Sequence, residues 1–157
     1  MVYLLALLIG IVAGLRAMTA PAAASWAGYL GILALTGTWL SFLTSIWAVV
    51  ILTVLAAAEL VTDQLPSTPS RKVPIQFATR VFMGALAGAA IGAGFGLTAG
   101  GLIAGAIGAV IGTLGGAAFR AALAKAFGRD RPAALIEDAV AILGAWLIIN
   151  AVRLLVS

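Results

Sequence analysis

The chain has 157 residues, of which 64% are hydrophobic and 9% are charged, and its formal net charge is +4. Soluble domains are about 45–50% apolar, so this composition excludes an ordinary soluble protein and predicts a single transmembrane domain over residues 1–157. The chain has no Cys and no His, which argues against disulfides, thiol nucleophiles, zinc sites and catalytic triads. Its basic residues lie in short loops beside apolar runs, which argues against nucleic-acid binding.

Hydrophobic segments at about 2–18, 20–35, 39–62, 74–98, 101–124 and 134–156 predict an all-α polytopic membrane protein with about six transmembrane helices. The first segment lacks the positive N-terminal charge of a signal peptide, so we expect it to be retained as a helix. Arg16, Thr19 and Pro21 interrupt residues 2–35. A five-helix fold with a broken first helix is therefore the alternative.

The basic loops predict the orientation of the helices. Loops 63–73 and 125–133 hold most of the basic side chains, namely Arg71, Lys72, Lys125, Arg129 and Arg131. The positive-inside rule places both loops in the cytoplasm, so with six spans both termini lie outside. Six spans also bring Arg16 to the cytoplasmic end, whereas five would bury it deeper at a higher cost.

Glycines recur every four residues in the two segments that Gly100 and Gly101 join. Small residues at this spacing let membrane helices approach closely, so a glycine-zipper hairpin is predicted in the second half of the chain. A glycine-lined pore is the alternative. The expected packing residues are Gly84, Gly88, Gly92, Gly96, Gly108 and Gly112.

The polar residues between the third and fourth segments are the best candidates for a site. Glu59 and Asp63 are four residues apart, so they share a helix face and would repel each other unless a cation, a proton or an arginine lies between them. The alternative is a structural network of ion pairs and helix caps. The candidate ligand-binding residues are Arg16, Thr19, Glu59, Asp63, Ser70, Arg71, Arg80 and Arg120.

The loop after Asp63 has features of an anion site. Pro66 and Pro69 favour a stiff, extended path that would position Ser70 and Arg71 reproducibly. A guanidinium beside hydroxyl groups suits phosphate, another small anion or a lipid headgroup. For Glu137 and Asp138 we expect a structural role, because both lie near the start of the last predicted helix, where acids interact favourably with its dipole.

Three stretches resemble a known family. They are Gly14-Leu-Arg16-Ala-Met-Thr-Ala-Pro21, then Glu59-Leu-Val-Thr-Asp63-Gln-Leu-Pro66 with Pro69-Ser-Arg71, and then Arg80 with Gly84-Ala-Leu-Ala-Gly88. Together they resemble the bacterial membrane family catalogued as domain of unknown function 4126. The resemblance implies a small helical protein of the bacterial inner membrane, with neither an activity nor a cofactor attached.

Three functions remain open at the level of sequence. The first is a transporter or channel with a polar Arg/Glu/Asp site on the cytoplasmic side, because interrupted helices often form such sites. The second is a non-catalytic assembly or lipid-organising protein, for which glycine packing and homo-oligomerisation suffice. The third is an enzyme acting on lipid phosphate headgroups, which the lack of His, Cys and any known catalytic motif makes the weakest. Membrane lipids are expected partners in all three.

Overall fold

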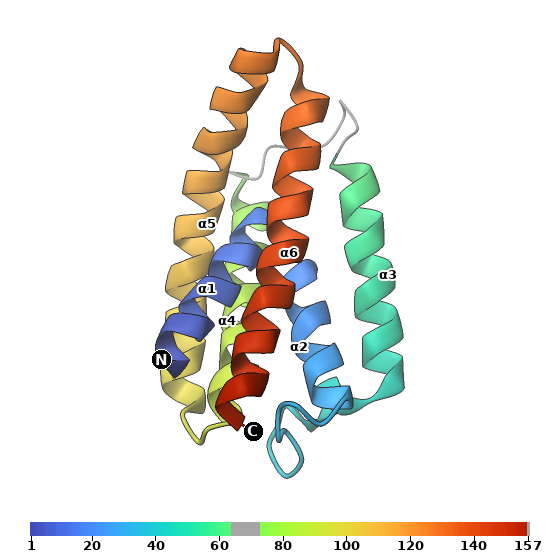
Figure 1. Cartoon of the computed structure of the whole chain (residues 1–157), viewed down its shortest axis with the longest axis vertical. Coiled ribbons are helices and arrows are strands. Elements are labelled where there is room, and N and C mark those ends of the chain that lie inside the picture. Colours follow the sequence, from blue (N-terminus) through green and yellow to red (C-terminus); the bar gives the residue numbers. More distant parts are fainter. Residues whose placement is uncertain (64–72, 157) are drawn as a thin grey trace.

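The computed structural model describes residues 1–63 and 73–156, which fold into a bundle of six α-helices and one short 3-10 helix (Figure 1). The all-helical prediction is therefore confirmed over these residues. The elements are α1 Val2–Leu15, α2 Thr19–Tyr29, η1 Ser41–Thr44, α3 Ile46–Thr62, α4 Pro74–Ala93, α5 Thr98–Phe127 and α6 Asp130–Val156.

Three of the helices, α4, α5 and α6, are long and apolar enough to cross a membrane. They contain 20, 30 and 27 residues, and a crossing requires about 20. The helices α1 and α2 contain 14 and 11 residues, or about 21 Å and 17 Å at the usual rise of an α-helix. Both are shorter than the roughly 30 Å hydrocarbon core, so the expected six crossings are not confirmed.

The first two helices form a hairpin inside the bundle. α1 runs from the end of the molecule that holds both termini, and α2 returns toward that end, while α5 and α6 extend well beyond the turn between them (Figure 1). The predicted segments 2–18 and 20–35 thus become shorter helices, and residues 30–40 form an irregular loop before η1. The turn of the hairpin, residues 16–18, is enclosed by the other helices.

Glycines bring α4 and α5 into backbone contact. A Cβ added at Gly84, Gly88 or Gly92 would lie less than 3.0 Å from atoms of α5 or of its first turn, including backbone oxygens of Gly105, Gly101 and Leu97 respectively. Such a contact is possible only without side chains. The expectation for Gly96 was wrong: it lies in the turn after α4 with φ +70°, and a Cβ there would meet nothing within 4 Å.

A second face of α5 packs against α1. The expected packing residues Gly108 and Gly112 face Leu7 and Ile11 of α1 rather than α4. On the α1 side, a Cβ at Gly10 would meet the backbone of Gly105, and one at Gly14 would meet Ala109, Gly112 and Thr113. α5 is thus the centre of the packing, and it holds the short α1 in place along its whole length.

The helix α3 stands at the edge of the bundle (Figure 1). Its one buried residue is Val49, near its start. Ser45 caps the helix by accepting a hydrogen bond from the Trp47 N–H at 3.2 Å. Apolar packing therefore contributes little to holding the far end of α3, where Glu59 and Asp63 lie.

Candidate functional site

The candidate site is built around the turn between α1 and α2. Arg16 ends α1 with an extended backbone, at φ −139° and ψ 110°, and Ala17 and Met18 form the turn. Pro21 lies in the first turn of α2, where its missing N–H is tolerated because no carbonyl of the same helix would receive it. The interruption that the sequence indicated at Arg16, Thr19 and Pro21 is thus a true helix break.

Side chains from α3 and α4 satisfy the backbone groups that the break exposes. Glu59 accepts hydrogen bonds from the N–H groups of Ala17 and Met18, each at 2.8 Å. Arg80 donates from Nη1 to the carbonyl oxygens of Leu15 at 2.7 Å and Gly14 at 3.1 Å. These N–H and C=O groups lack helical partners and would be costly to bury alone. The break is therefore stabilised from outside the hairpin.

Arg16 itself is the centre of the ion pairs, and its side chain is 0% exposed. Its Nε donates to Asp138 Oδ1 at 2.5 Å, and its Nη1 donates to Asp63 Oδ2. Its Nη2 also contacts Asp138 and lies 3.9 Å from Glu137 Oε2. A planar guanidinium suits this role because it offers donors in several fixed directions.

Two further arginines complete the cluster. Arg80 Nη2 lies 3.5 Å from Glu59 Oε1 and 3.8 Å from Asp63 Oδ2. Arg120 of α5 forms a fork with Asp130, at 2.9 Å and 2.5 Å.

Arg120 also reaches the end of α3 and the middle of the cluster. Its Nη2 donates to the backbone oxygen of Asp63 at 3.1 Å, and its Nη1 lies 3.6 Å from Glu137 Oε2. We call this cluster the break network; it comprises Arg16, Glu59, Asp63, Arg80, Arg120, Asp130, Glu137 and Asp138.

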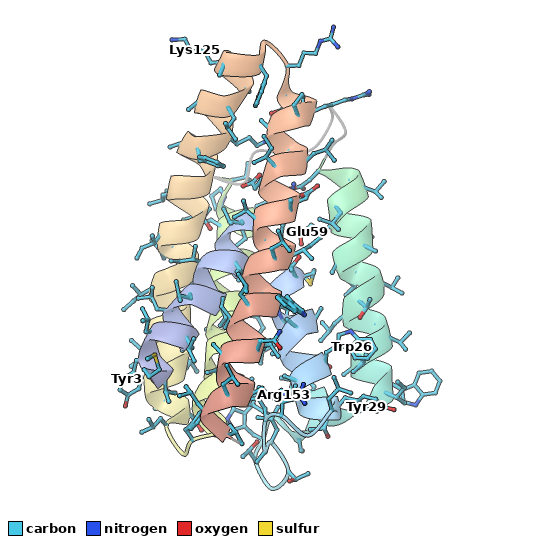
Figure 2. The ribbon with its side chains drawn as sticks, viewed as in Figure 1. Tyr3, Trp26, Tyr29, Glu59, Lys125 and Arg153 are labelled. Carbon is cyan, nitrogen blue, oxygen red and sulfur yellow. The ribbon has the colours of Figure 1, made fainter. Side chains whose placement is uncertain are left out.

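The break network contains all the carboxylate side chains of the chain, which has five Asp and Glu residues. The network draws on α3, α4, α5, α6 and the α1–α2 turn. Figure 2 places Glu59 between Lys125 at one end of the molecule and Arg153 toward the other. The network therefore extends from the end of α3, near Glu59, to the start of α6 at Asp130.

The network includes most of the predicted site residues. Arg16, Glu59, Asp63, Arg80 and Arg120 come together as described. Thr19 does not join them: it lines a cavity of about 420 Å³ between α2 and α6. Ser70 and Arg71, with Pro66 and Pro69, lie outside the described residues.

We expected Glu137 and Asp138 to interact with the dipole at the start of the last helix, and this reason was wrong. α6 begins at Asp130, so both acids lie about 10 Å further along the helix, beyond the first turn in which the dipole acts. They are 0% and 7% exposed and face Arg16. Asp130, which the sequence analysis did not select, holds the position at the helix start. The signal that could have identified these residues was the scarcity of acids in an apolar chain.

The break network consists of acids and guanidinium groups alone. Within residues 1–63 and 73–156, no three or more acids are arranged around a common point in a way that would hold a metal ion. The described network instead allows carboxylates to exchange between arginine partners, to take up protons, and to bind or release the backbone of the break.

Residues 3–156 match the family described as domain of unknown function 4126. The chain belongs to this family, as the resemblance implied. No curated protein and no solved structure matches the chain.

Proposed function

We propose that this member of the domain of unknown function 4126 family is a small multi-pass transporter of the bacterial inner membrane. In this proposal the break network takes up and releases a proton. The observation that carries the proposal is the helix break itself, whose backbone is held by Glu59 and Arg80 from two other helices. Discontinuous helices with charged partners at intermediate depth are typical of transporter sites.

The break network also offers a way for ion binding to change the structure. Asp63 lies at the end of α3, paired with Arg16 through its side chain and with Arg120 through its backbone oxygen. Because Val49 is the one buried residue of α3, these polar contacts hold the far end of the helix. A proton on one of the carboxylates would weaken the contacts and shift the population toward a state in which α3 has moved.

The composition of the network favours a positively charged solute. Among the described residues, five carboxylates share three guanidinium groups, so the acidic side chains of the network outnumber its basic side chains. An anion would compete with those carboxylates for the same arginines. A proton requires only one carboxylate, and carboxylates that exchange partners are the usual proton relays of membrane transporters.

Glu137 is the carboxylate with which to test this function. Its side chain is 0% exposed, and its Oε2 lies between Arg16 Nη2 at 3.9 Å and Arg120 Nη1 at 3.6 Å. Glu137→Gln keeps the shape, removes the charge and leaves the bonds of Glu59 to the break intact. Arg129→Gln is the control, because it also replaces a charged side chain by an amide, and the exposed Arg129 lies outside the break network in the turn between α5 and α6.

The experiment measures proton flux into liposomes that contain the purified protein and a pH-sensitive dye, under a proton gradient. We expect flux above that of empty liposomes, a loss of at least about tenfold in Glu137→Gln, and near-normal flux in Arg129→Gln. Thermal unfolding in detergent should show that Glu137→Gln remains folded. Absence of flux in the wild type, or unchanged flux in a folded Glu137→Gln protein, would overturn the proposal.

A non-catalytic assembly or lipid-organising protein is the second candidate. It is favoured by the apolar outer side of α3, where Ile51 and Val54 are 55% and 61% exposed. A second copy or lipid could cover this side, and the break network would then serve only to hold the hairpin. This candidate predicts a stable homo-oligomer with no ion flux, and Val54→Glu should dissociate it into monomers.

A further inference from the structure

The cavity that contains Thr19 is a groove between α2 and α6 at the end of the molecule where the termini lie. It has a volume of about 420 Å³, within the range of roughly 300–1,000 Å³ that small-molecule sites occupy. Its walls are mainly apolar and include Trp26, Ile149 and Trp146, with Asn150 and Arg153 toward the outer end. No residue of the break network lines this groove, so the role proposed for it below is separate from the proposed proton site.

The groove has the length of one membrane leaflet. Along α6 it extends from Ile142 to Arg153, a rise of about 16 Å, or close to half of the roughly 30 Å hydrocarbon core. Thr19 lies at its inner end beside the helix break, and Arg153 lies toward the end of the molecule that holds the termini (Figure 2). The acyl chain of a phospholipid extends over about this length below its headgroup.

Arg153 supplies a positive charge at the outer end. It is exposed in the last turn of α6, and among the described residues the structure gives it no hydrogen-bond or ion-pair partner. A second cavity of about 250 Å³ adjoins the first through Leu30, Ile32 and Arg153. The guanidinium therefore stands between a groove suited to an acyl chain and a smaller space suited to a headgroup.

We propose that this groove binds an anionic phospholipid, with an acyl chain between α2 and α6 and the headgroup phosphate against Arg153. A guanidinium binds phosphate oxygens in a bidentate fashion. A long basic side chain at the end of a membrane helix reaches the level of the headgroups. The indole rings of Trp26 and Trp146 suit the same boundary between lipid and water.

The test is native mass spectrometry of the delipidated protein in detergent, titrated with phosphatidylglycerol or with phosphatidylcholine of the same acyl chains. We expect tighter binding of phosphatidylglycerol and a loss of about fivefold in Arg153→Gln, which corresponds to the electrostatic contribution of one basic residue at an anionic surface. Arg129→Gln is the matched control, because Arg129 lies in the turn between α5 and α6 at the opposite end. It should bind phosphatidylglycerol as the wild type does.

A second measurement tests the place of the acyl chain. Trp146 is 61% exposed in the groove, whereas Trp47 is 73% exposed at the start of α3. In proteins that keep only one tryptophan, brominated phosphatidylglycerol should quench Trp146 more strongly than brominated phosphatidylcholine does, while Trp47 should not distinguish the two lipids. If a single-tryptophan protein fails to fold, Ala23→Leu, which narrows the groove, replaces it in the mass-spectrometric titration and should weaken binding.

Three outcomes would overturn the proposal. The first is equal affinity for the two lipids in the wild type. The second is an equal effect of Arg153→Gln and Arg129→Gln, which would indicate a general effect of charge. The third is quenching of Trp146 to the same extent by the two brominated lipids or, where Ala23→Leu replaces that measurement, unchanged binding in Ala23→Leu.

Discussion

Arg16 Nε donates a hydrogen bond to Asp138 Oδ1 at 2.5 Å, and this bond joins two residues that are 122 positions apart in the chain. The two side chains are 0% and 10% exposed. Buried charges are costly unless they are paired. The bond therefore fixes the short α1–α2 hairpin to α6, and its loss should affect the whole fold rather than one loop.

The first prediction concerns Arg16. Arg16→Gln leaves Asp63 and Asp138 without their main cationic partner, so we expect the free energy of unfolding to fall by about 3–5 kcal/mol. Titration with a denaturing detergent measures this change. The double variant Arg16→Gln with Asp138→Asn should recover part of the loss, because the uncompensated charge is then removed. An Arg16→Gln protein as stable as the wild type would contradict the central position of Arg16.

The second prediction concerns the cap on the helix break. Glu59 accepts from two backbone N–H groups, one with each oxygen, whereas the amide of Gln has only one oxygen. Glu59→Gln should therefore lower stability by about 1 kcal/mol, and Glu59→Ala by more. Hydrogen exchange at Ala17 and Met18 checks the cause, since their N–H groups should exchange faster in both variants. Unchanged exchange at these two positions would show that Glu59 does not hold the break.

The third prediction separates buried from exposed charge. Asp130 pairs with Arg120, but its side chain is 59% exposed, so Asp130→Asn should cost at most about 1 kcal/mol. Asp138→Asn should cost clearly more, because it removes a buried partner of Arg16. Adding salt should reduce the effect of Asp130→Asn and leave that of Asp138→Asn nearly unchanged. If both variants lowered the free energy of unfolding equally, burial would not determine how much a charge contributes to the break network.

The fourth prediction uses two glycines of the α4–α5 pair. A Cβ at Gly88 would collide with the backbone of Gly101 and Gly105, whereas a Cβ at Gly115 would meet nothing within 4 Å. Gly88→Ala should therefore destabilise the protein by about 1–3 kcal/mol, and Gly115→Ala should stabilise it by up to about 1 kcal/mol through helix propensity. Thermal unfolding in detergent measures both. Equal tolerance of the two changes would refute the close contact.

The fifth prediction concerns the orientation of the bundle. The chain has no cysteine, so single cysteines can report on each end without further changes. Thr36→Cys in the loop after α2 should react with a membrane-impermeant reagent from the outside, and Arg129→Cys should react from the cytoplasm. Reporters fused to Met1 and to Ser157 should both read as external. Termini on opposite sides would instead indicate an odd number of crossings.

Part of the break network could be predicted from the sequence. The four-residue spacing of Glu59 and Asp63 placed both acids on one helix face, and the polar interruption at Arg16 and Pro21 marked the helix break. These are local properties, which spacing and residue type determine.

The remaining members of the network required the three-dimensional arrangement. Glu137 and Asp138 enter it because α6 passes beside the turn of the hairpin, and no local pattern encodes that proximity. The hydrophobic run from residue 20 to residue 35 likewise appeared long enough for a helix of its own. The helix ends at Tyr29, and residues after it turn back along the end of the bundle.

The dependence of α1 on α5 has a consequence for biosynthesis. The hairpin precedes α5 and α6 in the chain, yet its close contacts at Gly10 and Gly14 are with α5, and one buried partner of Arg16 is on α6. Arg16 ends α1, and an arginine without its acidic partners is costly within a membrane. We therefore expect the N-terminal hairpin to reach its final packing only after α5 and α6 have been translated and inserted.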